Sequence, residues 1–252
     1  MKNNKNTLVD IILLFFLFLI IIFSTKCDEE SALIQKLKSF LQNHVDNALL
    51  LKFLEFLRGL KQKEFPDHLA KNKAAFPNHL TTIKNNKGYI EDQRNYKDMF
   101  YGVSPFSDNG CELISIYNVL NYFGVQNIDL PGIIEKNEKD GMILSGAFGT
   151  SPIAIEDYFK KNGYKTMSSS QKKDYENIAS SSDALILTMY NDIKDITAQI
   201  HTVAITKNKF KYYVHNNGAN SASVGYTSIT ALLTKINSGK AKDIFLIGVS
   251  KK

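Results

Sequence analysis

The stretch NGCELISIYNVLNYFG, residues 109–124, decides how the rest of the chain is interpreted. Its apolar residues recur at helical spacing, so we expect a helix over 110–123 with Cys111 at its start. A cysteine that only fills the core can occupy any buried position along such a helix. A nucleophilic cysteine is best placed in the first turn, where the helix dipole and free backbone N–H groups stabilise a thiolate. The position of Cys111 therefore suggests a thiol nucleophile, with a buried core cysteine as the alternative.

The composition is that of a globular protein. The chain has 252 residues, of which 44% are hydrophobic and 22% are charged, and its net charge is +6. Of the 31 basic residues only Arg58 and Arg94 are arginines, the type that recognition of bases and phosphates favours. The lysines are scattered, and no helix-turn-helix, zinc-finger or RNA-binding motif is present. We expect no nucleic-acid partner.

The two cysteines, Cys27 and Cys111, do not resemble a disulfide framework. One follows an apolar N-terminal run and the other lies in the globular part of the chain. No Cys-x-x-Cys pair and no Cys/His cluster has the spacing of zinc ligands. The sequence therefore predicts neither a metal nor an organic cofactor.

Residues 11–23, IILLFFLFLIIIF, are wholly apolar and follow Lys2 and Lys5. The run is shorter than the ~20 residues of a full membrane span, and it matches the hydrophobic region of a signal peptide or a short uncleaved anchor. A buried core helix is the alternative. The N-terminal lysines place that end in the cytoplasm. We therefore expect residues 1–27 to be a signal peptide or membrane anchor, and the remainder to be secreted or membrane-anchored outside the cytoplasm.

Cleavage after Ser24, no cleavage, and lipid attachment at Cys27 are the three alternatives for this segment. Lys26 argues against lipid attachment, because small residues normally precede a lipidated cysteine. Residues 28–63 form an amphipathic helical segment whose apolar face packs on the domain or serves as a stalk, a partner helix or an inhibitory prosegment. The polar stretch 64–100, punctuated by prolines, is expected to be a linker or irregular arm.

From residue 101 to residue 252 the helices precede most of the strands. We expect helices at 110–123, 129–139, 152–162 and 228–237, and strands at 164–168, 184–190, 200–206, 210–216 and 244–249. This order favours an α+β fold over alternating βαβ units. Thr150 or Ser151 is expected to cap the helix at 152–162. The glycine-containing stretch before that helix is a loop or the wall of a substrate cleft.

The strands at 200–206 and 210–216 are joined by a short turn, which predicts an antiparallel hairpin. The start of the first strand then lies beside the end of the second, so His201 and Asn216 are expected to be neighbours. His215 is excluded because strand alternation points it away from Asn216.

A thiol nucleophile needs a base, and the base needs a third group that fixes its tautomer. In NGCELISIYNVLNYFG, HTVAIT and YYVHNNG the chain resembles the papain-like cysteine peptidase superfamily, and within it the peptidases that process double-glycine bacteriocin leaders. The resemblance covers residues 105–250. It implies a papain-like fold, with N-terminal helices packed on a C-terminal antiparallel β-sheet, and hydrolysis of a peptide or amide bond in a peptide or protein substrate.

The resemblance also implies roles for the matched residues. Cys111 would be the nucleophile, His201 the general base and then the general acid, and Asn216 the group that orients the imidazole, with Asn217 as the alternative. The backbone N–H of Cys111 would supply half of the oxyanion hole. In papain-type pairs the dipole and the imidazolium lower the cysteine pKa from about 8.5 toward ~4.

The chain departs from these relatives in two places. They carry a glutamine shortly before the cysteine that completes the oxyanion hole, whereas VSPFSDNG, residues 103–110, has none. Asn109 and Ser107, and less directly Ser104, are the candidate substitutes. Glu112 stands where the family has glycine, and a carboxylate beside a thiolate opposes its ionisation.

Three classes of function follow. The first is an extracytoplasmic thiol peptidase or amidase, cell-wall amidases included. The second is a catalytically inactive papain-like module that binds a peptide or a membrane partner. The third is a protein whose active part is the helical stretch 31–63 and whose domain is a scaffold. The membrane partner in each case is expected to act through the N-terminal apolar segment. The sequence leaves the substrate and the oligomeric state open.

Overall fold

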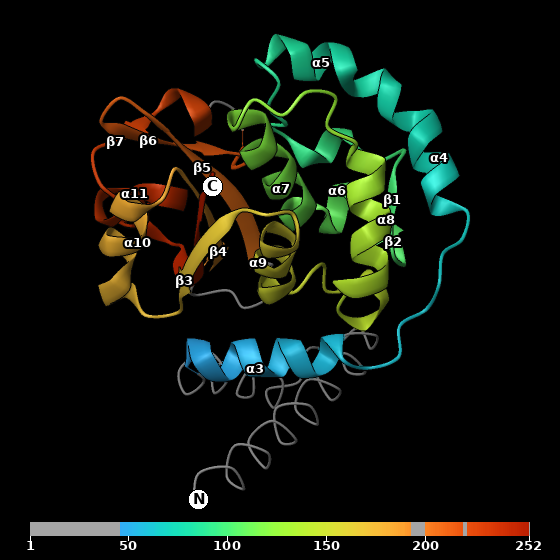
Figure 1. Cartoon of the computed structure of the whole chain (residues 1–252), viewed down its shortest axis with the longest axis horizontal. Coiled ribbons are helices and arrows are strands. Elements are labelled where there is room, and N and C mark those ends of the chain that lie inside the picture. Colours follow the sequence, from blue (N-terminus) through green and yellow to red (C-terminus); the bar gives the residue numbers. More distant parts are fainter. Residues whose placement is uncertain (1–45, 193–199, 219–220, 252) are drawn as a thin grey trace, which may run out of the picture.

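The computed structural model describes residues 46–192, 200–218 and 221–251. Helices come first in these ranges, and an antiparallel sheet dominates the C-terminal part (Figure 1). The expected α+β class is therefore confirmed. The signal or anchor expected at 1–27, with Cys27, and the first part of the helical segment lie outside the described residues. Among the helices that are described, none is long and apolar enough to span a membrane.

The helices lie mainly before and around the sheet: α3 (Asn47–Arg58), α4 (His68–Ala75), α5 (Leu80–Asn85), α6 (Phe106–Asn109), α7 (Cys111–Tyr122), α8 (Leu130–Asp140), α9 (Pro152–Lys161), α10 (Tyr175–Ser181) and α11 (Ile229–Lys235). The helices expected at 110–123, 129–139, 152–162 and 228–237 correspond to α7, α8, α9 and α11. Ser151 is the N-cap of α9 and its hydroxyl accepts from the N–H of Ile153.

The sheet has six antiparallel strands in the order β3-β8-β4-β5-β6-β7. The strands are β3 (Lys165–Ser169), β4 (Ala184–Tyr190), β5 (Ile200–Asn208), β6 (Lys211–His215), β7 (Gly225–Tyr226) and β8 (Lys242–Ser250). A separate two-stranded hairpin, β1 (Phe100–Tyr101) with β2 (Ser104–Pro105), precedes α6. All strands expected from the sequence are present.

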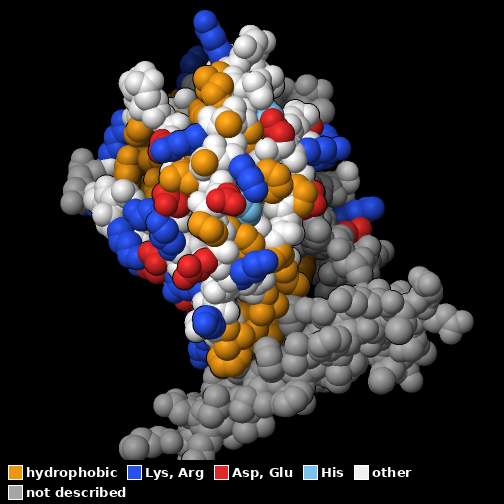
Figure 2. Space-filling model, turned by 90° about the vertical axis from the view of Figure 1, so that its right-hand side faces the viewer, with side chains coloured by type: hydrophobic (Ala, Val, Ile, Leu, Met, Phe, Trp, Pro, Cys, Tyr) orange, Lys and Arg blue, Asp and Glu red, His pale blue; other side chains and the backbone are white. Residues whose placement is uncertain are grey.

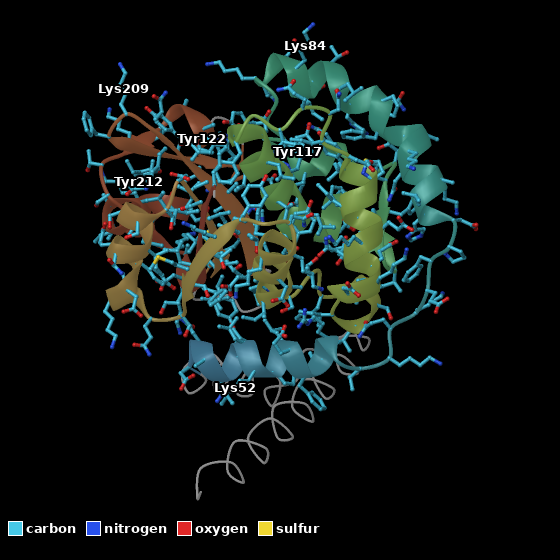
Figure 3. The ribbon with its side chains drawn as sticks, viewed as in Figure 1. Lys52, Lys84, Tyr117, Tyr122, Lys209 and Tyr212 are labelled. Atoms are coloured by element: carbon cyan, nitrogen blue, oxygen red, sulfur yellow. The ribbon has the colours of Figure 1, made fainter. Side chains whose placement is uncertain are left out.

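Alternation along the strands builds two apolar layers. On β4, Ile186 faces a core shared with α7, α8 and α9, whereas Leu185 and Leu187 face a core shared with α10 and α11. The two helix groups therefore cover opposite faces of the sheet (Figure 1). The far end of α7 is fixed to β5, because the Tyr122 hydroxyl (labelled in Figure 3) donates to the carbonyl of Lys207 at 3.0 Å.

The β5–β6 hairpin closes through Lys209, which adopts a left-handed φ of 56°, next to Phe210. Its pairing runs from Asn208 with Lys211 to Ala204 with His215. Beyond that point β6 ends, while β5 continues to Ile200 along β4. The expected hairpin is confirmed, and its open end lies at the start of β5.

The segment 64–100 differs from the expected linker or irregular arm. It forms α4 and α5, and it contributes four residues to the core: Ile83, Ile90, Tyr96 and Met99. The Asn72 side chain ties α4 to β1, because it donates to the Phe100 carbonyl at 2.9 Å and accepts from the Phe100 N–H at 2.8 Å. The few apolar residues of this stretch are buried against elements that are distant in the sequence. Hydrophobic periodicity detects only local patterns, so it did not predict this packing. The division into 1–27, 28–63, 64–100 and 101–252 stays a prediction.

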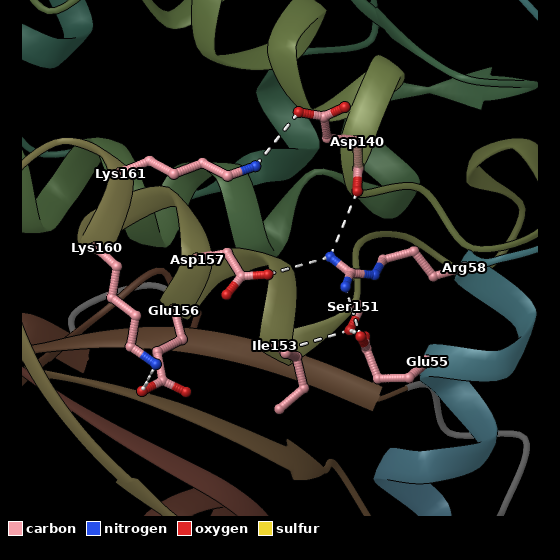
Figure 4. Close-up of polar contacts among 9 residues, drawn as sticks. All are labelled: Glu55, Arg58, Asp140, Ser151, Ile153, Glu156, Asp157, Lys160 and Lys161. Atoms are coloured by element: carbon pink, nitrogen blue, oxygen red, sulfur yellow. Dashed lines mark hydrogen bonds and ion pairs between the residues drawn. The ribbon is translucent and has the colours of Figure 1, made fainter.

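Helix α3 lies along one end of the domain (Figure 1). Its apolar face, with Phe53, Leu54 and Leu57, packs on Ile143. Figure 4 shows the polar contacts beside this face: the Ser151 hydroxyl donates to Glu55, and Arg58 reaches Asp157 at 3.5 Å. The described part of the helical segment therefore packs on the domain. On the surface drawn in Figure 2, basic side chains are mixed with acidic ones and do not gather in one patch.

The shared core around β4 sets the stability of the fold. We expect Ile186→Ala to lower the free energy of unfolding by about 2–5 kcal/mol, because it leaves a cavity between β4 and α7 at a fully buried position. Equilibrium urea unfolding measures the loss. Phe210→Ala, at a 93% exposed turn position, is the matched control and is expected to change stability by less than about 0.5 kcal/mol. Equal effects of the two substitutions would contradict this description of the core.

Candidate active site

Cys111 begins α7, is only 4% exposed, and its thiol reaches the start of β5. The backbone of Thr202 contacts the thiol, and the Ser115 hydroxyl, one turn further along α7, donates to the Thr202 carbonyl at 3.2 Å. These backbone groups are accessible because the pairing of β6 with β5 stops at Ala204. The thiol therefore lies beside the peptide group that joins His201 to Thr202.

His201 is half-buried and is held by Asn216. Its Nε2 lies 2.6 Å from the Asn216 carbonyl oxygen. A carbonyl only accepts, so Nε2 carries the proton and Nδ1 is the basic nitrogen of the neutral ring. Burial is the main influence on this histidine and lowers its pKa below the usual value, while the bond to Asn216 acts in the opposite direction. The imidazole is therefore neutral near pH 7 and is kept in one tautomer.

The side chain of Asn216 does not bind the imidazole. Its Oδ1 accepts from the N–H of Gln93 at 3.0 Å, and its Nδ2 donates to Gln93 Oε1 at 3.1 Å. The hairpin thus joins His201 and Asn216 as expected, but through the backbone of Asn216. Asn217, the alternative, donates to Asn237 at 3.1 Å. Among the described residues, no hydrogen bond joins the Cys111 thiol to the His201 imidazole.

The thiol is protonated in this conformation, contrary to the lowered pKa expected from the helix dipole and an imidazolium. Burial raises the pKa of Cys111 well above its usual value, and the charge of Glu112 raises it further. The contact with Thr202 acts in the opposite direction but is smaller. Desolvation of a charged sulfur thus outweighs the helix dipole at this buried helix start.

Glu112 is itself buried beside the thiol, with 4% of its surface exposed. The thiol hydrogen-bonds to the Glu112 carboxylate, and the Thr150 backbone also binds that carboxylate. Glu112 Oε2 has no partner in the described structure. Burial raises the pKa of Glu112 to about 7, so the carboxyl group is roughly half protonated at neutral pH.

The side-chain donors of the two candidate oxyanion residues, Asn109 and Ser107, already make hydrogen bonds within the protein. Both N–H groups of the Asn109 amide are bound, one to the Tyr101 carbonyl at 2.9 Å and one to the Gly146 carbonyl at 2.5 Å. The Ser107 hydroxyl donates to Asp108 at 2.8 Å. Neither side chain offers a free donor in this conformation, and an oxyanion role would require these bonds to break. Ser104 belongs to β2.

Two functional candidates were missed in the sequence, Glu91 and Gln93. Gln93 contacts Asn216 and also donates from Nε2 to the Ser107 carbonyl at 2.9 Å. Glu91 accepts from the Asn216 N–H at 3.2 Å and bonds His215 at 2.7 Å. No motif marks them, because the β1–β2 hairpin separates both from Cys111 along the chain. The exclusion of His215 as the base agrees with its bonds to Glu91 and Thr206.

The loop at 142–151 packs on the start of α7. Its Gly146 carbonyl binds Asn109, and Gly149, with a left-handed φ of 67°, lies so close to Glu112 that an added Cβ would be 3.0 Å from the carboxylate. Helix α3 and the residues after it hold the outer side of the loop, since Gln62 accepts from the Ser145 N–H at 2.5 Å and Glu55 binds Ser151. The loop therefore lies against Asn109 and Glu112, on either side of Cys111, and α3 packs on the loop.

No protein-family model and no curated protein matches this chain. Among solved structures, the fold is similar to the peptidase domain of Streptococcus ComA, a bi-functional ABC transporter involved in a quorum-sensing pathway. The two share 14% sequence identity, the match covers 57% of this chain and 93% of that domain, and the TM-score is 0.38. A similarity of this size does not identify a function. Within the described ranges, no group of three or more His, Cys, Asp or Glu side chains is arranged to hold a metal ion.

The raised pKa of Glu112 makes stability depend on pH. Between about pH 4.5 and pH 7 the folded state holds a proton on Glu112 that the unfolded state has released, so its contribution to stability is present below this range and is lost as pH rises through it. Glu112→Gln is expected to remove a decrease of about 3 kcal/mol across the window. Urea unfolding of both proteins at pH 4.5, 6 and 8 measures this, and parallel pH profiles would contradict it.

Enclosure by α3 is expected to slow access to the thiol. Glu55→Ala removes the contact with Ser151, which stabilises the closed loop by about 1 kcal/mol, so Cys111 alkylation by iodoacetamide should become about fivefold faster. Glu64→Ala, at an exposed position just after α3, is the matched control. Peptide mapping by mass spectrometry separates Cys111 from Cys27. Unchanged alkylation in Glu55→Ala would show that α3 does not control access.

Proposed function

We propose that this protein is a thiol hydrolase of peptide or amide bonds, with Cys111 as the nucleophile and His201 as the base. One observation carries the proposal. The thiol lies against the peptide group of His201 and Thr202, while Nε2 of the same His201 is bound to Asn216. The three groups that the chemistry needs thus gather where β6 leaves β5.

The geometry of the ring suits a base. The Nε2–H bond to the Asn216 carbonyl leaves the lone pair on Nδ1, which takes the thiol proton as the sulfur attacks the carbonyl carbon of the substrate. The imidazolium returns that proton to the departing amine, and a thioester remains. Water, deprotonated by the same ring, then hydrolyses the thioester and releases the acid and the free thiol. The backbone N–H of Cys111 is the donor assigned to the oxyanion.

The described conformation is the resting one in this proposal. Its thiol is buried, protonated and bonded to Glu112, and the amide of Asn109 is held by carbonyl groups. Displacement of the 142–151 loop would hydrate Glu112, separate it from the thiol and free the Asn109 amide. The reactive form is thus reached by opening this loop, and substrate enters over the start of α7.

A second candidate is a catalytically inactive module that binds a peptide. The same burial of the thiol, and the carboxylate of Glu112 beside it, favour this alternative. In that case Cys111 and Glu112 only fill the space beneath the loop.

The decisive experiment is alkylation of Cys111 by iodoacetamide from pH 4 to pH 9 in the full chain and in His201→Ala. If His201 is the base, the rate at pH 7 is expected to fall by ~10²-fold or more in His201→Ala, because general-base effects are typically ~10²–10⁴-fold. His44→Ala is the control histidine, placed outside the described residues. Identical rates and pH profiles in wild type and His201→Ala would overturn the hydrolase proposal and leave the binding module.

The proposal includes a location for the domain outside the cytoplasm. The apolar run at 11–23 with its preceding lysines favours a domain secreted or anchored outside the cytoplasm, with a peptide or protein as the substrate. Protease accessibility of the domain in intact cells tests this location, and protection of the domain from added protease would contradict it.

A further inference from the structure

Asn216 is fixed from every side. It follows the last residue of β6 with a left-handed φ of 63°, a conformation that asparagine tolerates better than other non-glycine residues. Its N–H donates to Glu91, its carbonyl accepts from His201, and both side-chain groups bind Gln93. All four polar groups of this residue therefore have partners, and three of these bonds come from Glu91 and Gln93.

The Glu91 end of this arrangement is itself rigid. Oε1 of Glu91 lies 2.7 Å from Nδ1 of His215, and Nε2 of His215 lies 2.8 Å from the Thr206 hydroxyl. The ring of Tyr89 stacks on His215 with 4.0 Å between centroids. Glu91 is thus oriented by β5 and β6 together, so its other oxygen is presented to the Asn216 N–H.

The Gln93 end reaches the cysteine side of the site. While Oε1 of Gln93 accepts from Asn216, Nε2 donates to the carbonyl of Ser107, in the short helix α6 directly before α7. One side chain therefore links the residue that holds the His201 ring to the turn that leads into Cys111. We find no other side chain among the described residues that bonds both of these parts.

We propose that Glu91 and Gln93 are positioning residues, which hold the Asn216 carbonyl on Nε2 of His201 and fix that ring relative to the start of α7. This inference rests on the proposed function for its catalytic meaning, but the geometry of the ring is measurable without any turnover. Gln93 acts through Asn216 and through Ser107, and it does not touch the reacting atoms. Left-handed Asn216 directs its carbonyl at the ring only while its amide and N–H remain bound.

The first measurement is the imidazole N–H proton of His201 by NMR in the ¹⁵N-labelled full chain. A ring N–H held by a carbonyl and shielded from water exchanges slowly and gives a resolved signal, assigned by its loss in His201→Ala. Gln93→Met, which keeps the length of the side chain and removes its hydrogen bonds, is expected to broaden this signal beyond detection. Gln126→Ala, at an exposed glutamine with only a local bond to the Gly124 carbonyl, is the matched control.

Two further variants distinguish the bond of the Gln93 side chain to Asn216 from its bond to Ser107. Gln93→Glu keeps an acceptor for Asn216 and loses the donor to Ser107, so the ring signal should persist while the alkylation rate of Cys111 falls. Asn216→Gly keeps the carbonyl and tolerates the left-handed backbone, but it has no amide for Gln93. If Gln93 holds the ring through Asn216, the double variant Gln93→Met/Asn216→Gly lowers the alkylation rate of Cys111 no further than Gln93→Met alone.

The second measurement is the pH profile of Cys111 alkylation in the same variants. Gln93→Met is expected to lower the rate at pH 7 by about tenfold or more, because a small displacement of a catalytic group has effects of this size. A retained ring signal and an unchanged profile in folded Gln93→Met would overturn the inference. A lost ring signal with alkylation that does not depend on His201 would instead support the positioning role and overturn the proposed hydrolase. If circular dichroism shows that Gln93→Met does not fold, Asn216→Gly takes its place in the test, because it also lacks the bond between the Gln93 side chain and residue 216. The His201 ring signal is then measured in Asn216→Gly.

Discussion

The departure of β6 from β5 is the constraint on which the candidate site depends. The pairing of β5 with β6 stops at Ala204, so Thr202, although paired with β4, has no strand beside it on the β6 side. Buried backbone groups need partners, so α7 supplies them through Ser115 and the Cys111 thiol. The same departure turns Asn216 out of the sheet and toward His201. The groups of the candidate site therefore complete the backbone hydrogen bonding of β5 where β6 departs from it.

Burial explains why the Cys111 thiol is protonated in this structure. The start of α7 offers a dipole, but the Cys111 thiol is buried, and desolvation of a thiolate is the larger effect. Glu112 is subject to the same penalty, which raises its pKa to about 7. Thiol and carboxyl group thus stabilise each other in forms that carry little charge. The loop opening that the proposed mechanism requires would change both together, since the two side chains are in contact.

Two kinds of interaction hold the candidate site together: hydrogen bonds at His201 and apolar packing at the 142–151 loop. His201 is supported by hydrogen bonds of directed geometry, from Asn216 and, behind it, Glu91 and Gln93. The cover over Cys111 is supported by an apolar helix face with a few polar contacts at its edge (Figure 4). Directed bonds keep a ring in one orientation, whereas an apolar face can separate and return without leaving unpaired groups. In the proposed mechanism the orientation of the His201 ring therefore stays fixed, and access to the Cys111 thiol changes.

The sequence by itself determined the α+β class, the helix that Cys111 begins and the hairpin that joins His201 to Asn216. These follow from local periodicity and turn chemistry, as in the apolar spacing of 110–123 and the short turn before 210–216. Helix α10 was missed because only Tyr175, Ile178 and Ala179 of it are buried, and the packed stretch 64–100 was missed because its apolar residues are sparse. Only the tertiary structure decided that the Asn216 backbone holds the ring, that Gln93 connects it to α6, and that the thiol is protonated. Those outcomes depend on contacts between residues far apart in the chain and on the exclusion of water, and no local pattern encodes either.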